Sequence, residues 1–362
     1  MSTATITKSL SLKKYRIPFM LLAMFNLLAG MAAGLVRIGW RFEVHSLAPS
    51  HGAIMVGGFL GTLIALEKLI PLKNKVLYAI PILSSGSLLA FCLDMPQEAI
   101  LMITVASFCL SGVFAFYYFK HRELQFLIML AGALCWLTGN VLLYSENFYP
   151  LSFPMWLGFI LLIIVGERIE ITKFLPVKNK QKALLFGLLT LYVVSAFISF
   201  HGIGSIAAGV SLIGISLWLL RYDVIRMSVT KSGLTKYVAI TLLCGYLALL
   251  ICGVFFISLN GSIMSYDVLV HTFFLGFVFA MIFAHGPIIL PGVLGISIKP
   301  FHKIFYVWLI VLQISWLSRT FADSVLDFQL RQISGALSVV AILGYFISLA
   351  VVTIRDLRGK TI

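Results

Sequence analysis

Residues 49–70 read PSHGAIMVGGFLGTLIALEKLI, and this stretch decides the fold. Its first eighteen residues, 49–66, contain no Asp, Glu, Lys or Arg. An α-helix needs about 20 mostly apolar residues to cross the hydrocarbon core of a bilayer, which is about 30 Å thick. The stretch therefore predicts a membrane-spanning helix.

The composition extends this prediction to the whole chain. Of the 362 residues, 60% are hydrophobic and only 11% are charged, and the mean hydropathy is +1.05. A soluble domain carries about 25% charged residues, so this chain has too few charges to cover a water-soluble surface. We expect an all-α protein, a polytopic bundle of membrane helices, with residues 1–362 forming a single integral membrane domain.

Loop-type residues divide the chain into about twelve apolar spans. We expect these spans near residues 17–40, 49–70, 76–94, 97–119, 124–145, 152–173, 183–200, 202–221, 236–259, 265–288, 302–320 and 331–354. Twelve helices with short loops use nearly the whole chain and leave no soluble domain of ordinary size.

The basic residues predict the orientation. With the N-terminus placed in the cytoplasm, 23 of the 27 Lys and Arg residues fall on the cytoplasmic side, and only Arg37, Arg41, Arg319 and Arg331 fall outside. Cytoplasmic loops of membrane proteins carry an excess of Lys and Arg. We therefore expect both termini to be cytoplasmic, in a multi-pass protein of the cytoplasmic (inner) membrane.

The net charge of +14 has the same explanation. In a soluble protein it would indicate a nucleic-acid partner, but here the positive charge lies in loops on one side of the bilayer. We expect the lipid bilayer as the main partner and no nucleic acid.

Three histidines lie within predicted spans: His51, His271 and His285. His51 and His271 both follow the outer start of their spans, at depths that differ by about 5 Å. Two neutral imidazoles at similar depth on neighbouring helices can bind a haem iron from opposite faces. The alternative is that each histidine hydrogen-bonds a neighbouring helix.

Two further features belong to this haem hypothesis. Gly57, Gly58, Gly61 and Gly276 would allow close backbone approach to a haem. The fourteen residues between His271 and the third histidine place both on one helix face, within about 40° of each other. A second haem at that third histidine, or a metal site that includes it, is therefore an open alternative.

An acidic cluster lies at the predicted cytoplasmic ends of two spans. Glu67 ends one apolar run, while Glu167 and Glu170 share a face of another helix by i,i+3 spacing. These carboxylates, together with His285, would form a proton or ion path. The alternative is a set of ion pairs between helix ends, with Arg168 extending to the lipid headgroups.

Arg319 is the candidate cation for a cofactor. It lies on the outer side with Asp267 and Asp323. An arginine there can pair with a haem propionate, or equally with either aspartate.

A resemblance to a known family follows from the two outer histidines. His51 in HGAIM on the second span and His271 in HTFFLGF on the tenth resemble the low-spin haem ligands of haem-copper oxidase subunit I. The twelve-span plan is similar to NnrS-type proteins, which are haem- and copper-containing membrane proteins linked to nitric-oxide stress. The chain departs from the oxidases in three ways. The sixth span has no histidine, and the seventh has only His201 at its end where an oxidase has a histidine pair. Leu269 and Phe273 flank His271 where an oxidase has a His-x-His pair.

The resemblance implies a function. We expect a haem b protein, closest to the NnrS type, in nitric-oxide stress or respiratory metabolism, with respiratory or denitrification membrane proteins as partners. The departures lead us to expect no oxidase-type copper site. The alternative is a twelve-helix secondary transporter for a small molecule or ion, although transporters usually carry charges near the midplane, which are nearly absent here.

Overall fold

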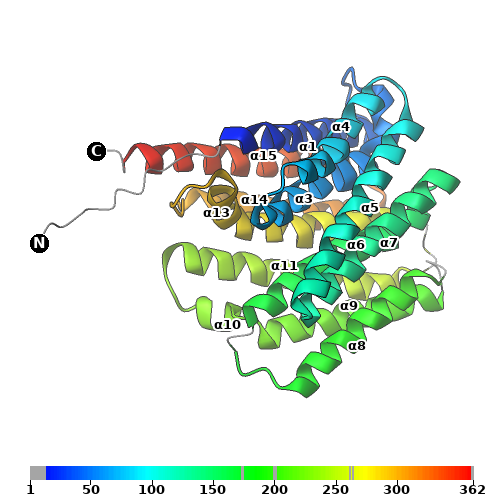
Figure 1. Ribbon diagram of the computed structural model, residues 1–362. Coiled ribbons are helices and arrows are strands. Elements are labelled where there is room, and N and C mark those ends of the chain that lie inside the picture. The colour runs from blue at the N-terminus through cyan, green and yellow to red at the C-terminus, as the bar shows by residue number, and fades with distance from the viewer. Residues whose placement is uncertain (1–13, 173–174, 199–201, 261, 263–264, 360–362) are drawn as a thin grey trace, which may run out of the picture.

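The computed structural model describes residues 14–172, 175–198, 202–260, 262 and 265–359, and all regular structure among them is helical. The elements, shown in Figure 1, are η1 Lys14–Arg16, α1 Ile17–Arg37, η2 His45–Ser50, α2 His51–Ala53, η3 Ile54–Gly61, α3 Thr62–Leu69, η4 Ile70–Leu72, η5 Val76–Tyr78, α4 Ala79–Cys92, α5 Pro96–His121, α6 Leu124–Glu146, α7 Tyr149–Thr172, α8 Asn179–Ala196, α9 Ile203–Tyr222, α10 Ile225–Ser228, α11 Gly233–Ser258, α12 Ser265–His271, η6 Thr272–Val278, α13 Phe279–Leu294, α14 Ile304–Val325 and α15 Phe328–Arg358.

Each of the twelve predicted spans overlaps a helix of this series. Ten of the described helices are long and apolar enough to cross a bilayer, the helix Val76–Cys92 is apolar but shorter, and α8 is not among the ten. The all-helical membrane bundle is therefore confirmed, while the count of twelve crossings stays a prediction. Residues 173, 199 and 200, at the ends of two predicted spans, lie outside the described residues.

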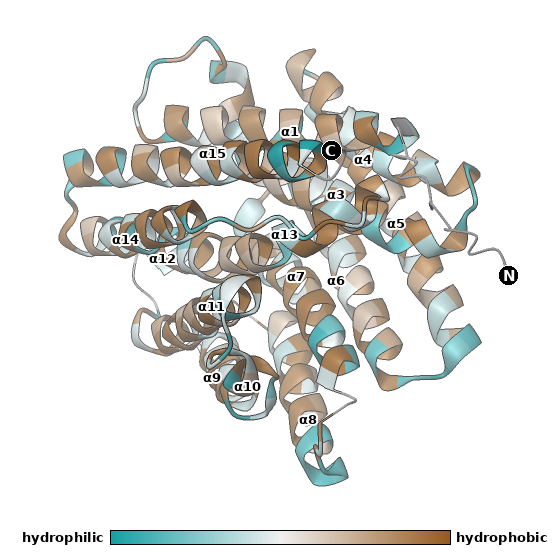
Figure 2. Ribbon diagram, turned by 90° about the vertical axis from the view of Figure 1, so that its left-hand side faces the viewer, coloured by the Kyte–Doolittle hydropathy of each residue, from teal (hydrophilic) through white to brown (hydrophobic). Residues whose placement is uncertain are grey.

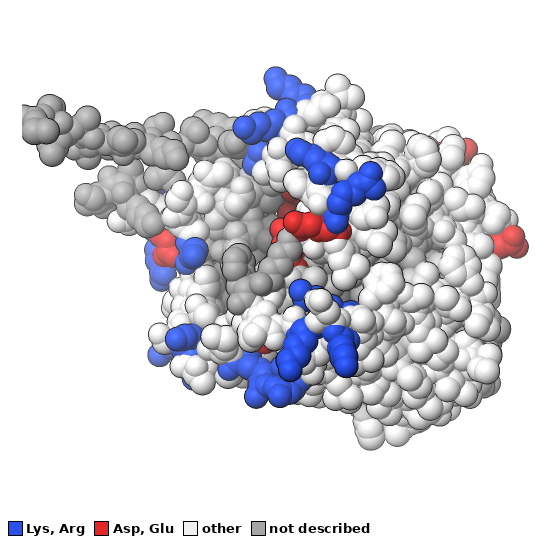
Figure 3. Space-filling view, turned by 60° about the horizontal axis from the view of Figure 1, so that its bottom comes forward, with Lys and Arg blue, Asp and Glu red and all other residues white. Residues whose placement is uncertain are grey.

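The two ends of the bundle differ in charge. α1 begins and α15 ends at the same side of the molecule (Figure 1), as an even number of crossings requires. Figure 2 shows hydrophobic colour along most of each helix. On the face in Figure 3, Lys and Arg side chains gather over the half nearer the chain ends, around a hollow with acidic side chains in it. We call this end inner and the opposite end outer, following the predicted orientation.

Two composite helices organise the centre of the bundle. Helix two comprises His45–Leu72 and helix ten comprises Ser265–Leu294. Each contains a π-helical segment close after a histidine: η3 begins three residues after His51, and η6 begins directly after His271. In a π-helical segment each backbone hydrogen bond spans five residues, one more than in an α-helix, and such segments often mark a functional site. The two helices contact each other through the stacked rings of Phe59 and Phe279.

Helix ten is longer than the sequence predicts. We expected its span to end near residue 288, but α13 continues through Pro287 and Pro291 to Leu294. A proline removes the hydrogen bond to the carbonyl four residues before it. For Pro287 that carbonyl belongs to Phe283, and it accepts a hydrogen bond of 2.7 Å from the hydroxyl of Tyr345. A neighbouring helix therefore replaces the missing bond, as membrane helices require.

Candidate functional site

The outer ends of helix two and helix ten border a cavity of about 520 Å³, which we call the outer cavity. Its walls come from α1, helix two, α7, helix ten, α14 and α15, and both His51 and His271 line it. This volume lies within the range of about 300–1,000 Å³ that is common for small-molecule and cofactor sites. The structure thus brings together two histidines that are 220 positions apart in the sequence.

The His51 ring is held by the neighbouring helix α1. Its Nδ1 lies 2.7 Å from the carbonyl oxygen of Gly30. A carbonyl only accepts hydrogen bonds, so Nδ1 carries the proton and donates it. The other ring nitrogen, Nε2, has no hydrogen-bond partner among the described residues. In neutral His51 this nitrogen has an available lone pair, which is the state that a metal ligand needs.

His271 has the same arrangement within its own helix. Its Nδ1 donates to the carbonyl oxygen of Asp267 at 2.9 Å and lies 3.4 Å from the carboxylate Oδ2 of that residue. Nε2 of His271 likewise has no partner within the described part of the chain. The outer cavity is therefore lined by two imidazoles that each hold a proton on Nδ1.

Two glycines of α1 make room for helix two, Gly34 for the His51 ring and Gly30 for the Met55 side chain. A Cβ atom at Gly34 would lie 2.7 Å from Cε1 of His51, and a Cβ atom at Gly30 would lie 2.5 Å from the sulfur of Met55. The pair forms a G-x-x-x-G pattern, which lets membrane helices approach closely. Sequence reasoning missed this pattern, although it is visible in the sequence.

The glycines that we expected to approach a haem have a different place. A Cβ atom at Gly57, Gly58 or Gly61 would meet side chains of other helices. These neighbours are Ile103, Asn26 and Trp136 respectively. None of the three glycines lines the outer cavity, and Gly276, which packs against Ala248 and Trp316, does not line it either. These glycines allow helix packing, and the prediction that they line the haem site is wrong for this cavity.

Arginines surround the outer cavity. Arg37, Arg319 and Arg331 all line it, and the one carboxylate among its described lining residues is that of Asp267. Two of the arginines bind this carboxylate, with Nη2 of Arg319 at 2.9 Å and Nη2 of Arg331 at 3.1 Å from Oδ2. Their second partner is Asp323, 3.4 Å from Nε of Arg319 and 3.0 Å from Nε of Arg331. The aspartate pairing that we left open for Arg319 is thus present.

The arginines and aspartates at the outer cavity nevertheless carry an excess of positive charge. There are three arginines and two aspartates, and Nη1 of Arg319 has no hydrogen-bond partner within the described ranges. The contact of Arg37 among the described residues is a long one of 3.4 Å, from Nη1 to the carbonyl oxygen of Ala48. The outer cavity can therefore receive an anionic group at its arginine side.

A second cavity of about 690 Å³, the inner cavity, lies further along the same helices. Glu67, Glu167 and His285 line it, so the structure brings three of the predicted acidic-cluster residues together. Glu170 is separated from them, because its side chain is exposed and does not line this cavity. The three predicted metal-binding histidines are likewise divided, with two in the outer cavity and one in the inner.

Lys68 joins the two carboxylates of the inner cavity. Its Nζ lies 3.1 Å from Oε1 of Glu67 and also pairs with Glu167. Helix two and α7 are thus linked by the kind of ion pair that we considered as the alternative to a proton path. Two carboxylates share one ammonium group, and the proton path stays a prediction.

His285 differs from the other two histidines. Its Nδ1 donates to the carbonyl oxygen of Met281 at 2.7 Å, and its Nε2 lies 3.3 Å from Nη1 of Arg168. A guanidinium only donates, so Nε2 accepts this hydrogen bond. A metal or haem iron at His285 would have to displace Arg168.

Arg168 itself is the main correction to the sequence interpretation. We expected it to extend to the lipid headgroups, but it is only 4% exposed. Its Nε and Nη2 make a two-point pair with the carboxylate of Asp223 at 2.7 and 2.8 Å, and the hydroxyl of Tyr246 donates to the same carboxylate at 2.9 Å. From the sequence we expected Tyr246 to make a packing or polar contact within the bundle, but sequence reasoning did not single out Asp223. The available signal was a lone acidic residue directly after Arg221 and Tyr222 in a basic loop.

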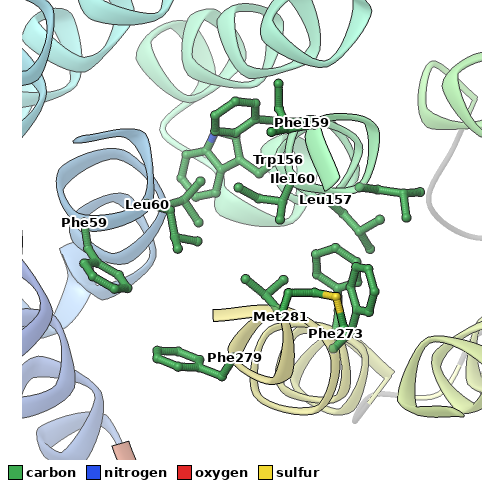
Figure 4. Packing of buried hydrophobic residues seen from close by; sticks show 14 of the residues in the cluster. Phe59, Leu60, Trp156, Leu157, Phe159, Ile160, Phe273, Phe279 and Met281 are labelled. Atoms are coloured by element: carbon green, nitrogen blue, oxygen red, sulfur yellow. The ribbon is translucent and has the colours of Figure 1, made fainter. Parts of the chain in front are cut away.

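The two cavities meet near the centre of the bundle. Leu60 lines both of them. Figure 4 shows Leu60 between helix two and α7, beside Trp156 of the outer cavity and Ile160 of the inner one. Aliphatic and aromatic side chains therefore separate a histidine site from a carboxylate site.

No cluster of three or more His, Cys, Asp or Glu side chains suited to a metal ion occurs among the described residues.

Comparison with other proteins found no match among curated proteins and no match among solved structures. A family model described as a domain of unknown function, DUF8744, matches residues 16–355, and the chain therefore belongs to this family.

Proposed function

We propose that the protein is a haem-binding integral membrane protein, with His51 and His271 as the two axial ligands of one haem b. The observation that carries the proposal is that both histidines line one cavity while Nε2 of each has no partner among the described residues. Metal-binding histidines commonly donate their other N–H to a carbonyl or carboxylate, as both of these do.

The remaining walls fit the parts of a haem. Apolar side chains such as Met55, Trp156 and Phe274 line the cavity and suit the porphyrin ring. Arg319 and Arg331 suit the propionates, because guanidinium groups bind carboxylates strongly. Bound haem would supply one-electron chemistry, and we propose a role in nitric-oxide stress or respiratory metabolism, as in NnrS-type proteins, alongside respiratory or denitrification membrane proteins.

The test is to express the protein in cells supplied with a haem precursor and to purify it in detergent. We expect about one haem per chain in a pyridine haemochrome assay, with sharp bands in the reduced-minus-oxidised spectrum. His51→Ala and His271→Ala should each abolish haem retention and leave the protein in the membrane. His45→Ala is the matched control, because this histidine is exposed and lies outside both cavities. A folded but colourless wild-type protein would contradict the proposal.

Secondary transport is the second candidate. The observation that favours it is that two cavities at opposite ends of the bundle share Leu60, since a transporter needs a path that opens to both sides. Reconstituted vesicles should then show uptake that is lost in Glu167→Gln. If several classes of small molecule give no uptake while haem is bound, the transporter proposal is contradicted.

A further inference from the structure

The inner cavity combines apolar walls with a polar end. Its lining consists mainly of aliphatic and methionine side chains from α1, helix two, α7, helix ten and α15. The charged groups that line it, Glu67 and Glu167, lie near the inner ends of helix two and α7. A molecule that fits this cavity must be apolar over most of its length and polar at one end.

The cavity opens toward the lipid. Leu28 and Ile347 line it, although their side chains are 43% and 62% exposed at the surface of the bundle. They belong to α1 and α15, which lie side by side (Figures 1 and 2). Each residue is eleven positions from the inner end of its helix, which corresponds to about 16 Å, or about half of the hydrocarbon thickness. An occupant can therefore enter from the bilayer interior.

The polar end of the cavity accepts hydrogen bonds. Both ring nitrogens of His285 are already engaged, by Met281 and by Arg168. Within the described part of the chain, the two glutamates share the ammonium group of Lys68 as their partner and therefore keep unused acceptor capacity. A fitting head must donate hydrogen bonds, and the excess of carboxylates also suits a positive charge.

We propose that the inner cavity binds a lipid-soluble molecule whose polar head, a phenolic hydroxyl or an ammonium group, donates hydrogen bonds to Glu67 and Glu167. The molecule reaches the cavity between α1 and α15, and its tail lies along the apolar walls. This inference does not rest on the haem proposal, because it concerns another cavity and other residues.

Photolabelling of the full-length protein in lipid nanodiscs tests the inference. Three probes carry the same decyl tail with a diazirine and differ in the head: 4-decylphenol, decylamine and the methyl ether of 4-decylphenol. Mass spectrometry then locates the covalent label, a measurement that does not depend on haem. We expect the phenol, the amine or both to label residues that line the inner cavity. This labelling should saturate as the probe concentration rises, and the same compound without the diazirine should compete with it. The methyl ether should label only lipid-facing residues such as Ile310.

Paired variants test where the head and the tail bind. A hydrogen bond to a charged group contributes about 1.5–3 kcal/mol, so the double variant Glu67→Gln, Glu167→Gln should weaken saturable labelling about tenfold or more. Glu170→Gln, which alters an exposed carboxylate on the same helix as Glu167, should change nothing. Ile282→Trp fills the cavity and should block labelling, whereas Ile310→Trp on the lipid-facing surface should not.

The probe that saturates the cavity identifies the head as a hydroxyl or an ammonium group. Equal labelling of the cavity by the methyl ether would overturn the proposal, because the head would then not be recognised. Labelling that is unchanged in the double glutamine variant or in Ile282→Trp would also overturn it. The double variant must elute as a single species in size-exclusion chromatography. If it does not, the comparison of Ile282→Trp with Ile310→Trp decides whether the probe binds in the inner cavity.

Discussion

The outer and inner cavities are built from the same pair of helices, yet they offer opposite chemistry. Each has a histidine from helix ten whose Nδ1 donates to the carbonyl four residues earlier, His271 to Asp267 and His285 to Met281. In the outer cavity Nε2 has no partner among the described residues, whereas in the inner cavity it accepts a hydrogen bond from Arg168. The hydrogen-bond partner of Nε2 therefore decides whether each of these histidines is available to a ligand.

The charges follow the same division. Three arginines line the outer cavity with one carboxylate, and two carboxylates line the inner cavity beside one lysine that joins them. An anionic cofactor suits the first arrangement and a hydrogen-bond donor suits the second. The predictions below disturb one cavity at a time and are ordered from the largest expected effect to the smallest.

Arg168→Ala should cause the largest loss of stability. It leaves the carboxylate of Asp223, which is fully buried, without its two-point partner, and removing one member of a buried pair costs about 3–5 kcal/mol in the free energy of unfolding. Thermal unfolding in detergent measures the effect. Arg355→Ala is the control, because the Arg355–Asp356 pair is exposed and should contribute about 0–1 kcal/mol. Equal effects of the two substitutions would contradict the buried network.

Arg319→Gln should weaken haem binding without changing the axial ligands. The loss of a charge-assisted contact to a propionate costs about 1.5–3 kcal/mol, which corresponds to about tenfold or more in affinity. Haem titration of the protein gives the affinity, and the positions of the absorption bands should stay as in the wild type. Arg41→Gln, at an exposed arginine that does not line the cavity, serves as the control. An unchanged haem affinity would show that Arg319 does not bind a propionate.

Gly34→Ala should disturb the outer cavity alone. The added Cβ atom would lie 2.7 Å from Cε1 of His51, and overpacking of this kind costs about 1–3 kcal/mol. We expect a weaker or altered haem spectrum while the inner cavity keeps its ligand. Gly112→Ala is the matched control, since nothing lies within 4 Å of the Cβ atom it would add. A normal spectrum in Gly34→Ala would show that the His51 ring does not depend on α1.

Tyr345→Phe should disturb the inner half of helix ten. It leaves the carbonyl of Phe283 without the hydrogen bond that replaces the one lost at Pro287, at a cost of about 1–2 kcal/mol. The melting temperature in detergent should fall, whereas Tyr144→Phe, at an exposed tyrosine, should change the stability by less than about 0.5 kcal/mol. Equal melting temperatures would mean that the helix tolerates Pro287 without help.

The fold was largely predictable because apolar length alone determines where a chain can cross a bilayer. Each predicted span overlaps a helix. The end of helix ten was not predictable, since Pro287 predicts a stop unless the hydroxyl of Tyr345 is known to bind the freed carbonyl of Phe283, which is 62 positions away in the sequence. The π-helical segments η3 and η6 were missed as well, because period and composition do not distinguish a π turn from an α turn.

The candidate site was predictable in part. Equal depth on helix two and helix ten indicated His51 and His271, and the structure places both in one cavity. The difference between these two histidines and His285 was not predictable, because it depends on Arg168 and its partner Asp223, which lies directly after the end of α9. Sequence spacing gives the depth of a side chain in the bilayer, whereas the hydrogen-bond partner of each imidazole nitrogen depends on how the helices pack.

Imidazole rescue of His51→Gly tests the central claim most directly. Haem with two histidine ligands is six-coordinate and low-spin, so removal of one side chain should abolish haem retention, and a haem titration of the purified variant should show no low-spin bands. Free imidazole added to the variant should restore the low-spin bands, and the same should hold for His271→Gly. A low-spin spectrum that persists in both variants without imidazole, or a wild-type protein that takes up no haem, would contradict the account.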